Sequence, residues 1–258
     1  MEGYRALSHG PTNPGLLTGN WLAESARVTL FSNDIRPTSI LLKLVGLNPE
    51  QVNERPVQNI RQESTSYKTG QLVVSHQPGR LDLIYAPKPP ANIFEAANSS
   101  PLVYVSELKA ALDEIIQIGA KLCDLIPDAV RIALCPIAIR QADTGPHAAI
   151  LLRDCFSGLP IQNETDSEVV WQVSRKSKAQ SFDGSLNSIY KLQSVTTQMI
   201  SVFMSSQPLP TPQTMVTAHF ARFELEVNTD IFSGNLGSTR IFTELSVAVR
   251  QALMKPGA

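Results

Sequence analysis

The chain carries little net charge and few charged residues. Lys and Arg number 22 against 23 Asp and Glu, so the formal net charge is −1, and charged residues make up 17% of the 258 residues. A general nucleic-acid binder usually carries a basic excess, because contacts to phosphates supply most of its non-specific affinity. Lys and Arg are scattered here, with their densest cluster at Arg175, Lys176 and Lys178. The composition predicts a globular chain with no partner attracted by charge alone.

Cysteine is scarce and unpaired. Cys123, Cys135 and Cys155 form no CxxC pair and have apolar neighbours, so we expect small core residues in a reducing compartment. The four histidines stand in no metal-ligand spacing: His9, His76, His147 and His219. We therefore expect neither a disulfide framework, nor a metal site, nor a cofactor.

No apolar run approaches the length of a membrane span, and the first residues lack the basic start and apolar stretch of a signal peptide. We therefore expect a cytoplasmic protein without a membrane partner.

Catalytic and phosphate-binding motifs are missing, because the sequence contains no GxGxxG, GxxxxGK[ST] or GxSxG. One glycine-rich loop, FSGNLGSTR, enters a helix. Its last residues Gly237, Ser238 and Arg240 could hold an anion on backbone N–H groups, although ordinary helix entry is the favoured interpretation.

Similar tetrapeptides occur in both parts of the chain. Residues 40–43 read ILLK and residues 150–153 read ILLR, and each precedes a Gly-Leu and a Pro. Around each match we predict the same order of elements. The sequence therefore predicts an α+β fold of internally duplicated β-α-β-β-β-α halves, with antiparallel sheets and long helices packed on one face. Coincidence is the alternative, because this tetrapeptide is common in helices.

The predicted boundaries follow from this order. Residues 1–20, rich in Gly, Pro, Ser and Asn, form a flexible or strap-like arm, residues 21–126 the first half, and residues 127–258 the second, and the halves can pack as one domain. In the first half we expect three extended segments between residues 57 and 87, and a helix over 105–126 capped by Ser106.

In the second half we expect a strand interrupted at Pro136, a short helix after Pro146 and three further extended segments. A change of apolar phase at Ala221-Arg222 predicts a bulge, and a final helix runs over about 239–253.

The stretch SHQPGRLD places a hydroxyl, an imidazole, a guanidinium and a carboxylate within eight residues. Pro78-Gly79 suits the two central positions of a type II turn, so the flanking side chains alternate between the faces of a hairpin. We expect a hairpin that brings no nucleophile and base together. A binding role for His76 and Arg80 is the alternative.

Three functions are compatible with these observations. The first is a non-enzymatic assembly or binding subunit acting through sheet faces or edges. The second is a nucleic-acid or nucleotide binder, and the third is an enzyme with a site between the halves. The second uses cations and rings as contact groups: Arg61, Tyr67, Arg80, Trp171, Arg175, Lys176 and Lys178.

The segment at residues 188–204 is long, rich in Val, Ile, Thr and Met, and has Lys191 as its one charge. An edge strand without charges, bulges or cover is a template for another chain. The sequence therefore predicts that this strand is either central in its sheet or paired with a protein partner, in a homodimer or a stable hetero-complex.

Overall fold

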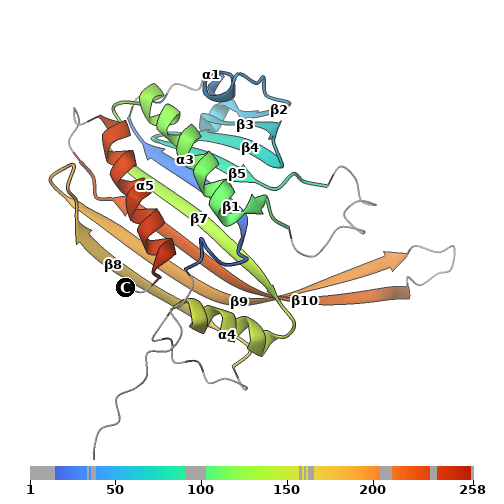
Figure 1. Ribbon diagram of the computed structural model, residues 1–258. Helices are drawn as coiled ribbons and strands as arrows, with labels where there is room; N and C mark the ends of the chain where they lie inside the picture. The colour runs from blue at the N-terminus through green and yellow to red at the C-terminus, as the bar shows by residue number, and fades with distance from the viewer. Residues whose placement is uncertain are drawn as a thin grey trace, which may run out of the picture.

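The computed structural model describes residues 15–33, 35, 39–90, 103–156, 159, 161, 166–203, 211–232 and 237–256. A 10-stranded antiparallel sheet forms their framework, with the order β2-β3-β4-β5-β1-β7-β10-β9-β8 and with β6 beside β1 (Figure 1). The strands are β1 (Leu22–Phe31), β2 (Gln51–Arg55), β3 (Ile60–Tyr67), β4 (Gly70–Gln77), β5 (Arg80–Ala86), β6 (Ser106–Glu107), β7 (Arg131–Ala142), β8 (Val170–Lys178), β9 (Ser185–Phe203) and β10 (Thr211–Thr229). The mixed α+β class predicted from the sequence is confirmed.

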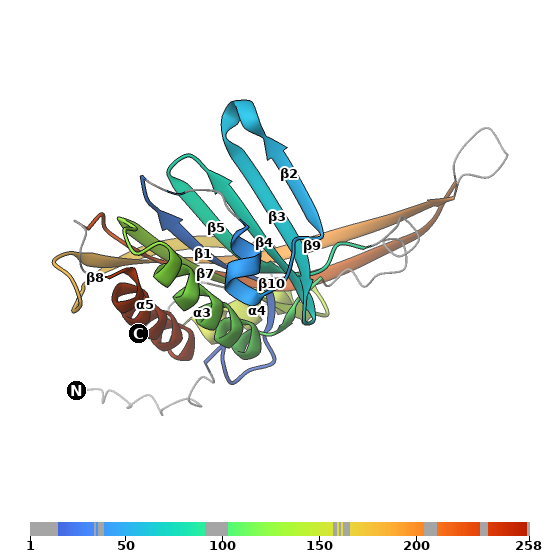
Figure 2. The ribbon, with the colours of Figure 1, turned by 90° about the horizontal axis from the view of Figure 1, so that it is seen from above.

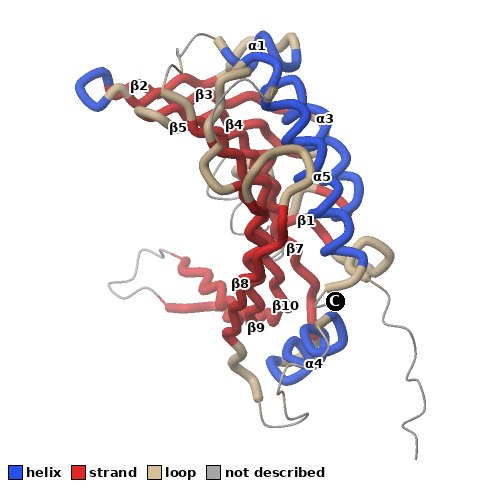
Figure 3. Tube along the Cα trace, turned by 90° about the vertical axis from the view of Figure 1, so that its left-hand side faces the viewer, coloured by secondary structure: helices blue, strands red, loops and turns tan. Residues whose placement is uncertain are grey.

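The helices of the described chain lie on one side of the sheet and leave its other face open (Figure 3). They are α1 (Ile40–Val45), α3 (Leu108–Leu125), α4 (Gly145–Cys155) and α5 (Ser238–Met254). No helix among the described residues is both long and apolar enough to cross a membrane.

Helices α3 and α5 pack together over the centre of the sheet (Figure 1). Gly119 makes this close approach possible, because a Cβ atom there would lie 2.6 Å from Cζ of Phe242 in α5 and 2.9 Å from Cγ2 of Val28 in β1. The described part of residues 1–20 joins the same layer. Leu16 is 1% exposed, and its N–H donates to the carbonyl of Leu253 at the end of α5.

The main hydrophobic core lies between the helices and the sheet. The central strands contribute alternate residues to it, because successive side chains of a strand point to opposite faces. In β1 these are Ala26, Val28 and Leu30, and in β10 they include Phe223 and Leu225. The core is continuous across residues 21–126 and 127–258, because β1 and β7 are neighbours in the sheet.

β7 runs through Pro136 without a break, so the predicted interruption is wrong. Pro136 lies opposite Ala26 of β1. On its other side, the ladder to β10 has a gap at Pro136, between the pairs Ile137–Glu224 and Leu134–Val227, and the register is the same on both sides of the gap. A missing N–H removes a ladder bond on one side of a strand and leaves the other side paired. A proline is therefore compatible with this central strand.

The first half contains one strand more than predicted in its meander. β2 and a 3-10 turn at Pro56–Gln58 precede β3, which begins at Ile60 rather than at Val57. Ser106 is not the cap of α3. It lies in β6, and its hydroxyl donates to the carbonyl of Glu107, which is the residue at the start of the helix.

The bulge predicted at Ala221-Arg222 is also wrong. β10 keeps one register with β9 from Thr229 to Thr214, and the shift lies between Thr214 and Pro212. The change of apolar phase has another cause, because two successive parts of β10 have their buried side chains on opposite faces of the sheet. Phe220 belongs to a second apolar cluster on the open face, whereas Phe223 belongs to the main core.

Several local predictions are confirmed. Gly46 ends α1 with a left-handed φ of 71°, and Gly79 takes φ 75° in the predicted hairpin turn. All three cysteines are buried and free. Burial raises the pKa of each thiol, to about 11 for Cys155 and about 12 for Cys135.

Candidate interaction surface

Strands β9 and β10 extend past the rest of the sheet as a two-stranded arm (Figures 1 and 2). β8 pairs with β9 as far as Gln193, and β7 pairs with β10 from His219 onward. Beyond these limits, the sheet pairings of the described chain give residues 195–203 no neighbour except β10, and residues 211–218 no neighbour except β9. At the spacing of an extended strand, this arm is about 30 Å long.

The two outer edges of the arm differ in their protection against pairing. The β10 edge contains Pro212, which has no N–H to donate, and a register shift between Pro212 and Thr214. Prolines and bulges are two of the devices that stop an edge strand from adding another chain. The β9 edge at residues 195–203 has no proline, no glycine and no register shift of its own. We call this segment the β9 edge.

Charge, the third common device, is also missing from the arm. The sequence has no Asp, Glu, Lys or Arg from Leu192 to Ala221. The two terminal strands of the sheet are different, because β8 carries Arg175, Lys176 and Lys178, and β2 carries Glu54 and Arg55. Among the unpaired strand edges of the described chain, the β9 edge is therefore the least protected.

The backbone direction along the β9 edge follows from one hydrogen bond. The N–H of Ser194 donates to the carbonyl of Val169 at 2.9 Å, so it is directed to the outer side of β9. Because N–H groups alternate between the two sides of an antiparallel strand, those of Thr196, Gln198 and Ile200 are directed to the same outer side. The described strands include no partner for these backbone groups, so a further strand can pair with them.

The base of the arm is fixed to the open face by the second apolar cluster. Ile139, Ala218 and Phe220 are buried there, with Leu22 and Val195 packed against them. Beside this cluster lies an open pocket of about 600 Å³, which Pro87 and Val103 also line. Phe220 is 1% exposed, so its packing holds the base of the arm in place against the sheet.

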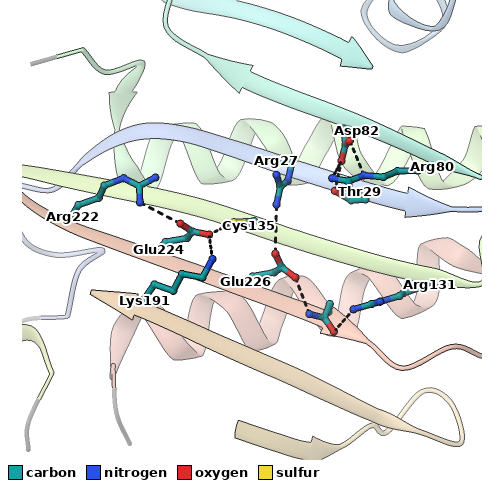
Figure 4. A network of polar contacts seen from close by, with 11 residues as sticks. Arg27, Thr29, Arg80, Asp82, Arg131, Cys135, Lys191, Arg222, Glu224 and Glu226 are labelled. Atoms are coloured by element: carbon teal, nitrogen blue, oxygen red, sulfur yellow. Dashed lines mark hydrogen bonds and ion pairs between the residues drawn. The ribbon is translucent and has the colours of Figure 1, made fainter. Parts of the chain in front are cut away.

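A band of charged side chains crosses the centre of the open face (Figure 4). At one end, Asp82 of β5 is 7% exposed and accepts hydrogen bonds from Arg80 at 2.8 and 3.0 Å and from the Thr29 hydroxyl at 2.5 Å. The ring of Phe31 lies between Arg80 and Arg131, whose guanidinium carbons are 5.7 and 5.4 Å from its centroid.

The band continues across β7 to β10 and β9. Glu224 accepts hydrogen bonds from Lys191 at 3.0 Å and from Arg222 at 3.2 Å, and Glu226 forms an ion pair with Arg27 at 3.5 Å (Figure 4). Both signs of charge alternate along the band, so it neutralises itself. Such a surface is suited to hold neighbouring strands in register rather than to attract a polyanion.

The residues predicted to bind nucleic acid or another ligand do not form one surface. Alternation and packing place five of them on the face that the helices cover, namely Arg61, Tyr67, His76, Trp171 and Arg175. Arg80 lies on the open face, and the register of β8 puts Lys176 and Lys178 on that side as well.

The covered residues have structural contacts. Tyr67 donates to Glu114 of α3 at 2.6 Å, and the Trp171 and Phe156 rings lie with centroids 4.7 Å apart. Arg61 forms ion pairs with Glu63 at 2.7 Å and with Glu54.

The His76 imidazole is buried to 2% exposure, and its Nδ1 has no hydrogen-bond partner among the residues that the structure describes. Burial lowers its pKa, against the opposing effect of a hydrogen bond with the backbone of Ile35. In the SHQPGRLD hairpin, His76 therefore faces the helices whereas Arg80 and Asp82 form their pair on the other face. Ser75 lies opposite Asp82 on that other face, so the side chains of the hairpin alternate between the two faces, as predicted.

The loop predicted as an anion site lies partly outside the described residues, which resume at Gly237. The Ser238 hydroxyl donates to the carbonyls of Ile126 and Pro127 at 3.0 and 2.8 Å, so it connects the start of α5 to the end of α3. The Arg240 N–H donates to the Gly237 carbonyl in the first turn. These contacts are those of ordinary helix entry.

Sequence reasoning found the β9 segment but missed the arm and the charged band. The signal for the arm was available, because the uncharged stretch continues through β10. The band had no comparable signal, since Arg27, Glu224 and Asp82 are scattered in the sequence and are brought together by the order of the strands.

No group of three or more His, Cys, Asp or Glu side chains suited to a metal ion occurs among the described residues. Comparison of the chain with protein-family models, curated proteins and solved structures finds no match.

Proposed function

We propose that the protein is a non-enzymatic assembly subunit that forms a homodimer by pairing the β9 edges of two copies. One observation carries this proposal: the β9 edge on the projecting arm is uncharged, free of proline and unpaired within the described part of the chain. Strand addition at an exposed edge satisfies main-chain N–H and C=O groups that would otherwise depend on water.

A second copy fits this edge better than it fits the others. In an isologous contact the same strand lies against itself across a two-fold axis, so every side chain meets a copy of the same segment. At the β9 edge no charges are opposed. At β8 the same arrangement would bring the cations of Arg175, Lys176 and Lys178 toward their copies, which is unfavourable.

We also propose that the two halves arose by internal duplication. The strand order supports this, because β1-β5-β4-β3 in the first half has the same sequence of elements as β7-β10-β9-β8 in the second, with α3 and α5 following. In this correspondence β4 matches β9 and β5 matches β10. The arm is then an extension of the second hairpin, since β4 has 8 residues and β9 has 19.

Sedimentation velocity of the full chain over a micromolar range of concentration tests the proposal. We expect a dimer that dissociates on dilution. A shortened variant in which Asn-Gly replaces residues 198–217 keeps the opposed pair Thr197–Ala218 and the apolar cluster at the arm's base. This variant is expected to stay folded and to be monomeric. A full-length chain that is monomeric throughout contradicts the proposal.

The alternative functions receive less support. A sheet-based nucleic-acid binder needs its cations and rings on one face of the sheet, whereas here they are divided between the two faces.

The three buried thiols support a cytoplasmic location, since they are free in the structure.

A further inference from the structure

The pocket at the base of the arm, with a volume of about 600 Å³, lies on the open face of the sheet. The arm bends toward this side, away from the helices (Figure 3). Val195 and Thr197 of β9 belong to the pocket lining, so the arm itself forms one wall. The other apolar residues of the described lining are Pro87, Val103, Ile139 and Phe220. The pocket therefore presents mainly apolar side chains in the angle between the arm and the sheet.

The polar part of this lining carries no net charge. The described lining holds one cation, Arg222, which donates to its one carboxylate, Glu24, at 2.6 Å. Arg222 also donates to Gln193 and to Glu224, both at 3.2 Å, so its guanidinium is already hydrogen-bonded within the chain. An apolar surface can cover this lining without leaving a buried charge unpaired.

Exposed apolar residues adjoin the pocket. Val103 in its lining is 53% exposed. Val170 at the start of β8 is 79% exposed and lies opposite Gln193, another lining residue, so it is on the same open face. Exposed apolar residues that gather around one hollow are typical of an interaction surface.

The β9 edge alone offers little area for a dimer. The arm is about 30 Å long and a sheet layer is about 10 Å thick, so the paired edge covers roughly 300 Å² per copy. A stable interface of standard size covers about 800 Å² on each partner. The proposed dimer therefore needs a second contact surface beside the β9 edge.

Two-fold pairing of the β9 edges brings the second copy to this pocket. Two identical strands that pair antiparallel run in opposite directions, so full overlap of residues 195–203 places residue 203 of the second copy opposite Val195. Val195 lies in the wall of the pocket. The outer end of the second copy's arm is therefore beside the pocket at the base of the first.

We propose that the pocket at the base of the arm is the second contact surface of the homodimer, and that the outer end of the second copy's arm covers it. This inference rests on the proposed pairing of the β9 edges. Each copy contributes one arm and one pocket, so two-fold symmetry forms the contact twice in each dimer.

Sedimentation equilibrium of Val103→Asp tests this contact. The folded monomer keeps the new carboxylate in water, because Val103 is more than half exposed, whereas the dimer buries it without a partner. We expect the dissociation constant of the dimer to rise at least tenfold. Val247→Asp makes the same change at a 49% exposed position on α5, outside the lining, and is expected to leave the constant unchanged. Circular dichroism establishes that both variants are folded.

Thiol labelling measures the cover over the pocket directly. In Val103→Cys the introduced thiol is the accessible one, because the three native thiols are buried. We expect a maleimide to label it at least tenfold more slowly under dimer-forming conditions than after dilution, whereas Val247→Cys should react at one rate in both. Slow labelling of residue 103 at both concentrations means that the chain itself covers it, and fast labelling at both means that the pocket stays open. Either result overturns the proposal.

Failure of the dimer and failure of the covered pocket are distinguishable. A chain that stays monomeric contradicts the homodimer and, with it, the contact at the pocket. A chain that dimerises, but in which Val103→Asp and Val247→Asp have the same effect on the dissociation constant, contradicts the contact at the pocket alone.

Discussion

The N–H of Ser194 donates to the carbonyl of Val169 at 2.9 Å, at the point where the described ladder between β9 and the β8 segment ends. Past it, the outward N–H groups of Thr196, Gln198 and Ile200 have no strand beside them in the described chain. In the proposed dimer these groups donate to the partner copy.

We therefore predict that the amides of Thr196, Gln198 and Ile200 are protected from hydrogen exchange at concentrations where the dimer forms. Protection should fall on dilution, whereas Leu192 inside the sheet should stay protected. Exchange mass spectrometry at two concentrations measures this. Rapid exchange at the three outward positions under dimer-forming conditions contradicts the prediction.

Removing Arg61 should destabilise the first half strongly. Glu63 is 3% exposed and receives the Arg61 guanidinium at 2.7 Å, and its other oxygen is 3.5 Å from the N–H of Leu41 in α1. Arg61→Met leaves the buried carboxyl group without its cation, which costs about 3 kcal/mol. Glu54→Gln removes the exposed partner of the same arginine and should cost less than about 1 kcal/mol.

Urea unfolding of the two variants measures the difference. Adding Glu63→Gln to Arg61→Met should recover part of the loss, because the buried group is then neutral. Similar losses of unfolding free energy in Arg61→Met and Glu54→Gln would show that the burial of Glu63 does not determine how much its pair with Arg61 contributes to stability.

Gly119→Ala should destabilise the contact between α3, α5 and β1. Alanine is favoured over glycine inside a helix by about 1 kcal/mol, but overpacking in a core costs about 1–3 kcal/mol. Because the new Cβ would lie 2.6 Å from the Phe242 ring, we expect a net loss of stability. In a double-mutant cycle with Phe242→Leu the two changes should be coupled favourably, and additive losses would contradict the steric explanation.

His76 should make stability depend on pH. Because burial lowers its pKa in the folded state, the unfolded chain takes up a proton first, near its ordinary pKa of about 6.5. The contribution of neutral His76 is present above that pH and is lost as the pH falls below it. In chemical unfolding between neutral and mildly acidic pH, His76→Gln should reduce this slope. His219→Gln, at a partly exposed position, serves as the control, and an equal reduction there would exclude His76 as the cause.

Local sequence patterns predicted the elements well where neighbours in the chain decide the structure. Gly46 ends a helix and Gly79 forms a turn, each through its own backbone conformation. The helical spacing of the apolar residues in α5 predicts that helix in the same local way. Ser106 and Pro136 misled the prediction because tertiary pairing overrode local preference, with β6 beside β1 and β7 in the middle of the sheet.

The candidate site was predicted in part. The absence of charge identified the β9 segment as unusual, and the alternatives offered were a central strand or a strand that pairs with a partner. The structure places residues 185–193 between β8 and β10, as the first alternative states, whereas residues 195–203 extend beyond β8. Where β8 ends depends on pairing between distant segments, which one sequence does not reveal.

The backbone at Gln198 gives the most direct test of the account. Gln198→Pro removes one outward N–H and leaves the inward ladder to β10 in place, as a proline on an edge strand does, whereas Gln198→Ala changes the side chain and keeps the N–H. Sedimentation equilibrium should show that Gln198→Ala dimerises like the unmodified chain and that Gln198→Pro dimerises at least tenfold more weakly, since both copies lose a hydrogen bond of about 1 kcal/mol. Equal dimerisation of the two variants, with both folded, would contradict pairing through the β9 edge.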